Sequence, residues 1–190
     1  MYVYMQAAVS FAPRTLALLA ATIAFSVSAS ASAGVYLGLG FGTKPNVNDA
    51  MENVGAPSGN SLRGLVGLRV ANFSLEGAVN GFNVATQPNG KETVYQASAA
   101  LKLSIPIVGP LEGFGRGGLE RTWLNMDDDR YNLSGNGFLA AGGLELRLNA
   151  VIASMSVFVD YTVHHVNLES AVNKVDSTSQ VLGLGLTVGI

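Results

Sequence analysis

The 190-residue sequence contains no cysteine, and charged side chains make up only 13% of it. The absence of cysteine excludes disulfides, thiolate metal sites and a cysteine nucleophile. It also suits an oxidising compartment, where a stray thiol is a liability. The formal net charge is −2, so the chain lacks the basic surplus typical of nucleic-acid-binding domains. Soluble domains have about 25% charged residues, so the low charge and a mean hydropathy of +0.33 set this chain apart from them.

Long apolar runs are also missing, because no run of 18 apolar residues follows the N-terminal segment. This excludes a transmembrane helix in the rest of the chain. The apolar segment 15–27 is itself too short to cross a bilayer as a helix, which needs roughly 20 residues. Arg14 precedes it and small residues follow it up to Ala33, the pattern of a secretory signal peptide. We expect cleavage between Ala33 and Gly34, which gives a signal peptide over residues 1–33 and a mature domain over residues 34–190.

The sequence is rich in glycine, with 23 residues, and in period-two alternation of apolar side chains. In the final stretch, Leu182, Leu184 and Leu186 alternate with small residues and no charge interrupts them. Alternation of this kind is typical of a β-strand whose two faces meet different surroundings. We expect eight such strands, over residues 34–42, 61–70, 73–82, 94–105, 111–123, 137–148, 155–163 and 181–190.

The connections between these segments alternate between short and long. Such alternation predicts an antiparallel meander, with tight turns at one end and loops at the other. Eight strands also place both ends of the domain at the tight-turn end. The short connections are 71–72, 106–110 and 149–154, and the long polar ones are 43–60, 83–93, 124–136 and 164–178.

One face of the middle strands carries five cations and five carboxylates, whereas the other face is aliphatic along all eight strands. A soluble sandwich would bury the aliphatic face, but a membrane barrel turns it toward lipid and lets the charges neutralise one another inside. Glycines on the charged face support the second arrangement, because a narrow eight-stranded barrel has little interior room. The charged residues are Arg63, Arg69, Glu76, Lys102, Glu112, Arg116, Glu120, Glu145, Arg147 and Asp160.

The predicted fold is therefore a transmembrane, eight-stranded, antiparallel up-and-down β-barrel. In hydrocarbon a sheet has to close, because each unpaired polar edge group costs several kcal/mol. We therefore expect the last strand to pair with the first. We interpret the interior charges as structural ion pairs rather than the lining of a pore, because eight strands leave no wide channel.

The sequence resembles the eight-stranded outer-membrane β-barrel family, of the outer-membrane-protein-A transmembrane-domain and opacity-protein kind. The resemblance lies in the signal peptide, GVYLGLGFG at 34–42, LRGLVGLRVANFSLEGAVNGF at 62–82 and LGLGLTVGI at 182–190. It implies export through the periplasm to the outer membrane of a Gram-negative cell. The implied partners are outer-membrane lipid, lipopolysaccharide, periplasmic chaperones and the barrel-assembly machinery, which reads the C-terminal strand. That family commonly ends on an aromatic residue, whereas this chain ends on Ile190, after which we expect no peptidoglycan-binding domain.

The two histidines, His164 and His165, are the candidates for catalysis, with Glu169 and Ser170 near them in the sequence. A Ser-His-acid triad is conceivable from these residue types. The His-x-Ser spacing of lipid-A deacylase barrels is missing, so we interpret both histidines as residues of the barrel rim. We predict no catalytic residues and no cofactor.

The connection 124–136 holds polar residues suited to the membrane surface. Asp127, Asp128 and Asp129 could attract a divalent cation, but the Gly and terminal Glu of a calcium loop are missing, so we predict no metal site. Arg121 and Arg130 could contact lipopolysaccharide phosphates. The aromatic residues expected at the membrane interface are Phe41, Tyr95, Trp123 and Tyr131.

These observations favour a non-enzymatic outer-membrane barrel with a structural or surface-interaction role. One alternative is a lipid-A-modifying enzyme on the same barrel. Another is a soluble, secreted, calycin-like barrel that holds a small apolar ligand.

Overall fold

The computed structural model describes residues 33–48, 56–86, 90–124, 132–149, 153–169 and 174–190. The predicted signal peptide lies outside these residues, except for Ala33. Within the described residues, eight long strands and two very short ones make up a single sheet. The strands are β1 Ala33–Gly42, β2 Asn46–Val47, β3 Ala56–Pro57, β4 Ser61–Val70, β5 Phe73–Thr86, β6 Gly90–Val108, β7 Leu111–Leu124, β8 Leu133–Asn149, β9 Ser154–Glu169 and β10 Lys174–Gly189.

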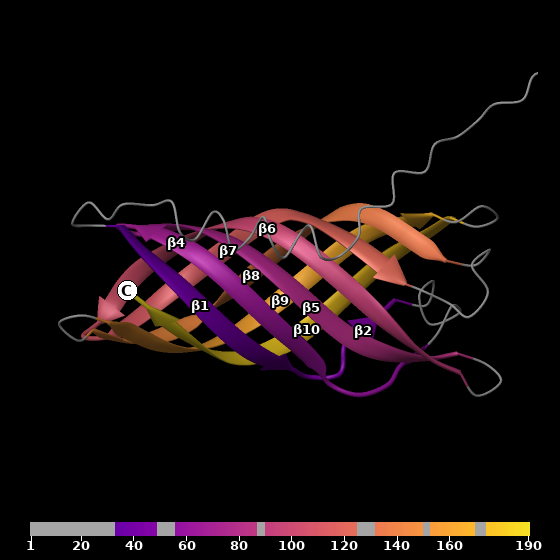
Figure 1. The fold of residues 1–190 in the computed structure, drawn as a ribbon, viewed down its shortest axis with the longest axis horizontal. Helices are drawn as coiled ribbons and strands as arrows, with labels where there is room; N and C mark the ends of the chain where they lie inside the picture. The colour runs from indigo at the N-terminus through magenta and orange to yellow at the C-terminus, as the bar shows by residue number, and fades with distance from the viewer. Residues whose placement is uncertain (1–32, 49–55, 87–89, 125–131, 150–152, 170–173) are drawn as a thin grey trace, which may run out of the picture.

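The eight long strands form a closed antiparallel meander, which confirms the predicted fold (Figure 1). Each long strand pairs with the next long strand along the chain, and β1 also pairs with β10, from Tyr36 opposite Gly189 to Gly42 opposite Gly183. Beyond that ladder, Val35 and Ile190 exchange two backbone hydrogen bonds of 3.1 and 3.0 Å. The bare apolar C-terminal strand is thus a paired strand of a cylinder, without the exposed edge that would promote aggregation.

The first long connection is more ordered than the sequence suggested. It contains β2, which pairs with β10 at Ser179 and Gln180, and β3, which pairs with β5 at Val84 and Ala85. Both β10 and β5 run past the ends of β1 and β4, so their outer backbone groups need new partners. The two short strands supply those partners.

The predicted loops at 83–93, 124–136 and 164–178 are wrong over much of their length. Strand β5 continues to Thr86 and β6 begins at Gly90, whereas β8 begins at Leu133. Strand β9 likewise continues to Glu169 and β10 begins at Lys174. The barrel wall therefore extends well past the alternating segments, at the end that carries the long connections (Figure 1).

The reason is a change of polarity along strands that keep the same inward and outward alternation. On β9 the inward residues change from Asp160, Thr162 and His164 to Val166 and Leu168, all of which are buried. The outward residues change in the opposite sense, from valines to Asn167 and Glu169, which are exposed. The sequence thus loses its aliphatic-outward pattern where the strand leaves the apolar belt, although the strand itself continues.

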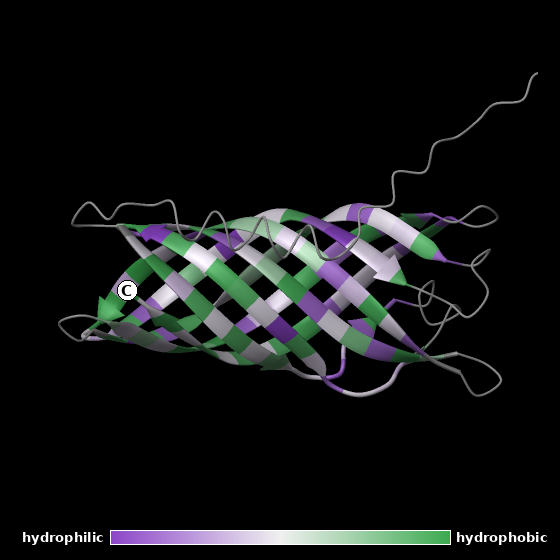
Figure 2. Cartoon of the chain, in the orientation of Figure 1, coloured by the Kyte–Doolittle hydropathy of each residue, from purple (hydrophilic) through white to green (hydrophobic). Residues whose placement is uncertain are grey.

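A belt of exposed aliphatic and aromatic side chains surrounds the middle of the barrel (Figure 2). Leu39 on β1 is 66% exposed, Leu119 on β7 is 74% exposed and Leu184 on β10 is 59% exposed. A water-soluble protein would bury side chains of this kind, so their exposure indicates that the belt is surrounded by hydrocarbon. Among the described residues, no helix is both long enough and apolar enough to cross a membrane.

Candidate functional site

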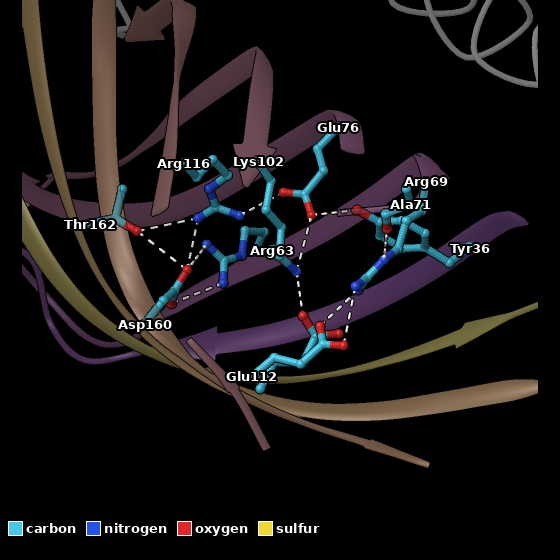
Figure 3. Close-up of polar contacts among 11 residues, drawn as sticks. Tyr36, Arg63, Arg69, Ala71, Glu76, Lys102, Glu112, Arg116, Asp160 and Thr162 are labelled. Carbon is cyan, nitrogen blue, oxygen red and sulfur yellow. Dashed lines mark hydrogen bonds and ion pairs between the residues drawn. The ribbon is translucent and has the colours of Figure 1, made fainter. Parts of the chain in front are cut away.

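Because side chains alternate between the two faces of each strand, ionic side chains from six strands lie in the interior of the barrel. Strand β4 contributes Arg63 and Arg69, β5 contributes Glu76, and β9 contributes Asp160, because each lies at an inward position of its strand. The remaining members come from β6, β7 and β8: Lys102, Glu112, Arg116, Glu120, Glu145 and Arg147. Each is buried or half-buried. Ion pairs join these members to one another (Figure 3): Arg63, Arg69, Glu76, Lys102, Glu112, Arg116, Glu145 and Asp160.

Asp160 accepts hydrogen bonds from two arginines on different walls. Arg63 approaches it as a fork, with Nη1–Oδ2 at 2.9 Å and Nη2–Oδ1 at 3.0 Å. Arg116 adds an Nη2–Oδ2 bond of 2.7 Å. The side chain of Asp160 is only 1% exposed, so both guanidinium groups are needed to offset its desolvation.

Arg116 continues the chain of contacts to Glu76 through an Nη1–Oε2 bond of 3.0 Å. Glu76 also accepts a hydrogen bond of 2.5 Å from the hydroxyl of Tyr36 and lies 3.6 Å from Lys102 Nζ. Lys102 in turn donates to Glu145 Oε2 at 2.5 Å. The connected network thus holds three cations and three carboxylates, and its formal charge is zero.

Aromatic rings fill the space beside this network. The guanidinium carbon of Arg63 lies 5.1 Å from the centre of the Phe158 ring, and Lys102 Nζ lies 4.4 Å from that of Phe114. Phe114 and Phe158 also pack with Leu65 in a buried cluster. Cation–π contact stabilises the desolvated charges, and the rings occupy volume that a pore would need.

A second ion pair lies toward the short-turn end. Arg69 donates to both carboxylate oxygens of Glu112, at 2.9 and 3.1 Å. The Nε atom of Arg69 donates to the carbonyl of Ala71 at 2.8 Å. Ala71 has a φ of +54°, which is unfavourable for alanine, so this bond supports the tight turn. Arg147 lies toward the same end of the barrel.

His164 lies inside the barrel, and its interpretation as a rim residue is wrong. Its side chain is 6% exposed, and Nδ1 lies 2.6 Å from Glu120 Oε2 on β7. His165 points outward, where Nδ1 lies 3.1 Å from Thr178 Oγ1. The two-residue period through Asp160 and Thr162 on the same strand could have placed His164 inside.

Beyond the His164–Glu120 pair, apolar side chains close the barrel at the long-connection end. Val84 and Leu124 are fully buried there, and Val47 of β2 packs against the cluster. Sequence reasoning missed this cluster, hereafter the apolar plug, because most of its residues lie in segments predicted as loops. The plug consists of Phe82, Val84, Val94, Leu124, Leu133, Val166 and Leu168.

Comparison with known proteins agrees with this architecture. A model of the outer membrane protein beta-barrel domain family matches residues 16–188. The chain belongs to that family. It is an outer-membrane protein of the Gram-negative type, so its short turns face the periplasm and its long connections face outward.

Two solved outer-membrane barrels resemble this one in fold. The Neisserial surface protein A structure has 13% identity and a TM-score of 0.58, with 85% of this chain and 99% of that one covered. The N-terminal β-barrel domain of Pseudomonas aeruginosa OprF has 10% identity and a TM-score of 0.52, with 84% of this chain and 98% of that one covered. A comparison with curated protein sequences gives no match. A soluble, calycin-like barrel would have its aliphatic side chains inside and its charges outside. This barrel has the reverse arrangement.

The outer surface of this outer-membrane barrel carries aromatic and polar side chains above the belt. Arg121 lies over the Trp123 ring, with 5.6 Å between the guanidinium carbon and the ring centre. Tyr95 on β6 is opposite Trp123 in the strand register. Phe41 at the end of β1 is exposed, in keeping with an interfacial aromatic.

The remaining candidates do not assemble into a site among the described residues. Glu169 is exposed and pairs with Lys174 at 2.5 Å, and this hydrogen bond raises the pKa of Lys174. Glu169 therefore lies outside the barrel wall, whereas His164 is inside. No group of three or more metal-ligating side chains occurs in the part of the chain that the structure describes. Six further candidates lie outside the described residues, namely Asp127, Asp128, Asp129, Arg130, Tyr131 and Ser170.

Proposed function

We propose that this protein is a sealed, non-catalytic outer-membrane barrel with a structural role in the envelope, which also presents its long connections for surface interactions. The observation that carries the proposal is the double closure of the lumen. The ion-pair network of Arg63, Lys102 and Arg116 with their carboxylates fills the membrane level, and the apolar plug fills the outer mouth.

The space left between these two layers supports the proposal. Two voids lie beside Arg63, Thr162 and His164, and their volumes are about 10 and 20 Å³. That is room for one or two waters in each, and far less than an aqueous channel requires. The network is also neutral, so it favours neither cations nor anions.

Planar-bilayer recording of the purified, refolded protein tests the closed lumen. We expect no stepwise conductance at moderate voltage, while an open porin inserted by the same procedure serves as the positive control. Reproducible ohmic steps of one size from the wild-type protein would contradict the proposal.

A lipid-A-modifying activity is the competing function, and His164 is the residue to test. Its Nδ1 is held by buried Glu120 below the apolar plug, where a lipid substrate has no access from the bilayer. We expect lipid A species, measured by mass spectrometry, to be the same in cells that lack the protein, express it or express His164→Asn. An acylation change that appears only with the wild-type protein would support the enzyme instead.

We also propose that outer-membrane lipid and lipopolysaccharide surround the belt, and that periplasmic chaperones and the barrel-assembly machinery receive the C-terminal strand. An aromatic residue is common near the end of the closing strand in the resembling family, and Ile190, which follows β10, is exposed. We expect Ile190→Phe to raise the fraction of newly made protein that becomes heat-modifiable. An unchanged or smaller fraction would argue that this position is not what the machinery reads.

A further inference from the structure

Arg121 differs from the arginines of the lumen in both direction and pairing. It points outward from β7 and is exposed, and its guanidinium contacts the Trp123 ring. No carboxylate lies within ion-pair distance of Arg121 among the described residues, whereas Arg63 and Arg69 each have one and Arg116 has two. A cation–π contact engages the charge of the guanidinium without using its N–H donors in hydrogen bonds, so these donors can bind an anion.

The level of Arg121 on the barrel identifies the kind of anion. The outward positions of β7 before it, from Leu111 to Leu119, are leucines and glycines of the apolar belt. Arg121 is the first polar outward residue, and Trp123 follows it toward the outside. The site therefore lies where hydrocarbon gives way to headgroups, and Arg side chains direct their charged ends to that boundary.

The surroundings of Arg121 on neighbouring strands favour a negative ligand. Ala97 on β6 and Asn136 on β8 lie opposite Arg121 in the register, and neither carries a charge. Tyr95, opposite Trp123 in the register, is 48% exposed. The site opens sideways to the bilayer and is separated from the lumen by the barrel wall.

We propose that Arg121, Trp123 and Tyr95 form a subsite for the phosphate group of an anionic glycolipid of the outer leaflet. The guanidinium donates charge-assisted hydrogen bonds to phosphate oxygens. The cation–π contact with Trp123 pre-organises the guanidinium, so less rotamer entropy is lost on binding. The amphipathic aromatic side chains lie along the sugar–acyl boundary of the bound lipid. This inference rests on the membrane position of the barrel and is independent of the closed lumen proposed above.

Trp123 makes the subsite directly measurable, because it is the one tryptophan of the chain. The full mature protein in detergent micelles would be titrated with bisphosphorylated lipid A, with enzymatically dephosphorylated lipid A and with inorganic phosphate, while Trp123 emission is followed. We expect a saturable change with the phosphorylated lipid and none with the other two at the same concentrations.

Variants at two cations then separate a specific site from general electrostatic attraction. Arg121→Gln should raise the midpoint of the titration at least about tenfold, the effect of one charge-assisted hydrogen bond. Arg121→Lys should retain most of the affinity, and Lys44→Gln, at an exposed cation of the first long connection, should leave the midpoint unchanged. Heat-modifiable gel mobility would establish that each variant is folded.

The proposal would be overturned by an Arg121→Gln midpoint equal to that of the wild type, by equal binding of dephosphorylated lipid A, or by an equal loss of affinity in Lys44→Gln. Saturation by inorganic phosphate at the same concentrations would show a free-anion site and would also overturn the lipid assignment. Bilayer recording is unaffected by any of these results, so failure of this inference is distinguishable from failure of the sealed barrel.

Discussion

Asp160 is the residue on which the lumenal charges depend most. It accepts hydrogen bonds from Arg63 and Arg116, which come from two other strands, and its side chain is 1% exposed. The gain from a buried ion pair is offset by desolvation of its members, so the pair itself stabilises the fold only weakly. Removal of one member is different, because the charges left behind stay desolvated without compensation.

Asp160→Asn should therefore destabilise the folded barrel by about 3–5 kcal/mol, since two buried guanidinium groups lose their shared carboxylate. Urea unfolding in lipid vesicles, followed by Trp123 fluorescence, would measure the free energy of unfolding. The matched control is Asp176→Asn, whose side chain is 63% exposed beside His165 and which should cost less than about 1 kcal/mol. Equal effects of the two substitutions would refute the structural role of the network.

Glycines on the inner face have two different roles. Gly183 leaves room for the Arg63–Asp160 pair, because an added Cβ there would collide with Asp160 Oδ1, whereas a Cβ at Gly40 would only touch Arg63 Nε, at 3.4 Å. At Gly118 the constraint is the backbone of the next strand, because an added Cβ would lie 2.6 Å from Ala100 Cα. The sequence predicted the first role but not the second, which depends on how closely the curved strands approach each other.

Adjacent glycines of β7 provide a matched test of that second role. Gly118→Ala should destabilise the barrel by about 1–3 kcal/mol, because the methyl group requires neighbouring backbone to move. Gly117→Ala faces lipid, where the nearest atom would be 3.9 Å from the new Cβ, and should be neutral or stabilising by up to about 1 kcal/mol. Urea midpoints in the same vesicles would compare them, and a cost at Gly117 as large as at Gly118 would contradict this role.

At the scale of the strand, the sequence predicted where strands occur better than where they end. Period-two alternation is a local property, so the turn-side ends at Val70, Phe73 and Leu111 were predicted correctly. On the loop side most strands were predicted too short: β5 and β9 end later than expected, and β6, β8 and β10 begin earlier, because aliphatic-outward polarity was taken as the mark of a strand. That polarity stops at the membrane surface, whereas backbone pairing continues to Glu169 on β9 and Lys174 on β10.

Hydrogen exchange would show that these extensions are stable parts of the barrel. The amides of Val166 and Leu168 lie between β8 and β10, with side chains in the apolar plug. We expect them to exchange at least about 100-fold more slowly than the turn amide of Gly109, equivalent to about 2.7 kcal/mol of local opening. Exchange as fast as at Gly109 would mean that residues 164–169 behave as a loop.

At the scale of the whole molecule, the closed cylinder follows from the solvent that surrounds it. Hydrocarbon cannot hydrogen-bond an open edge, so the pairing of β1 with β10 was predictable before any coordinates. The partners inside the barrel were not predictable, because Glu120 and His164 are 44 residues apart. Their contact depends on strand tilt and stagger, which are properties of the assembled barrel rather than of any segment.

The central claim is that aliphatic side chains of the barrel face lipid, and that the strands continue beyond the membrane surface into water at the long-connection end. Because the chain has no cysteine, single spin labels can be placed on β9 by Val157→Cys, Val159→Cys and Asn167→Cys, and their collision rates measured in lipid vesicles. We expect labels at 157 and 159 to collide mainly with dissolved oxygen, and the label at 167 to collide mainly with a water-soluble nickel chelate. Greater access of the nickel chelate than of oxygen at 157 and 159 would contradict the account.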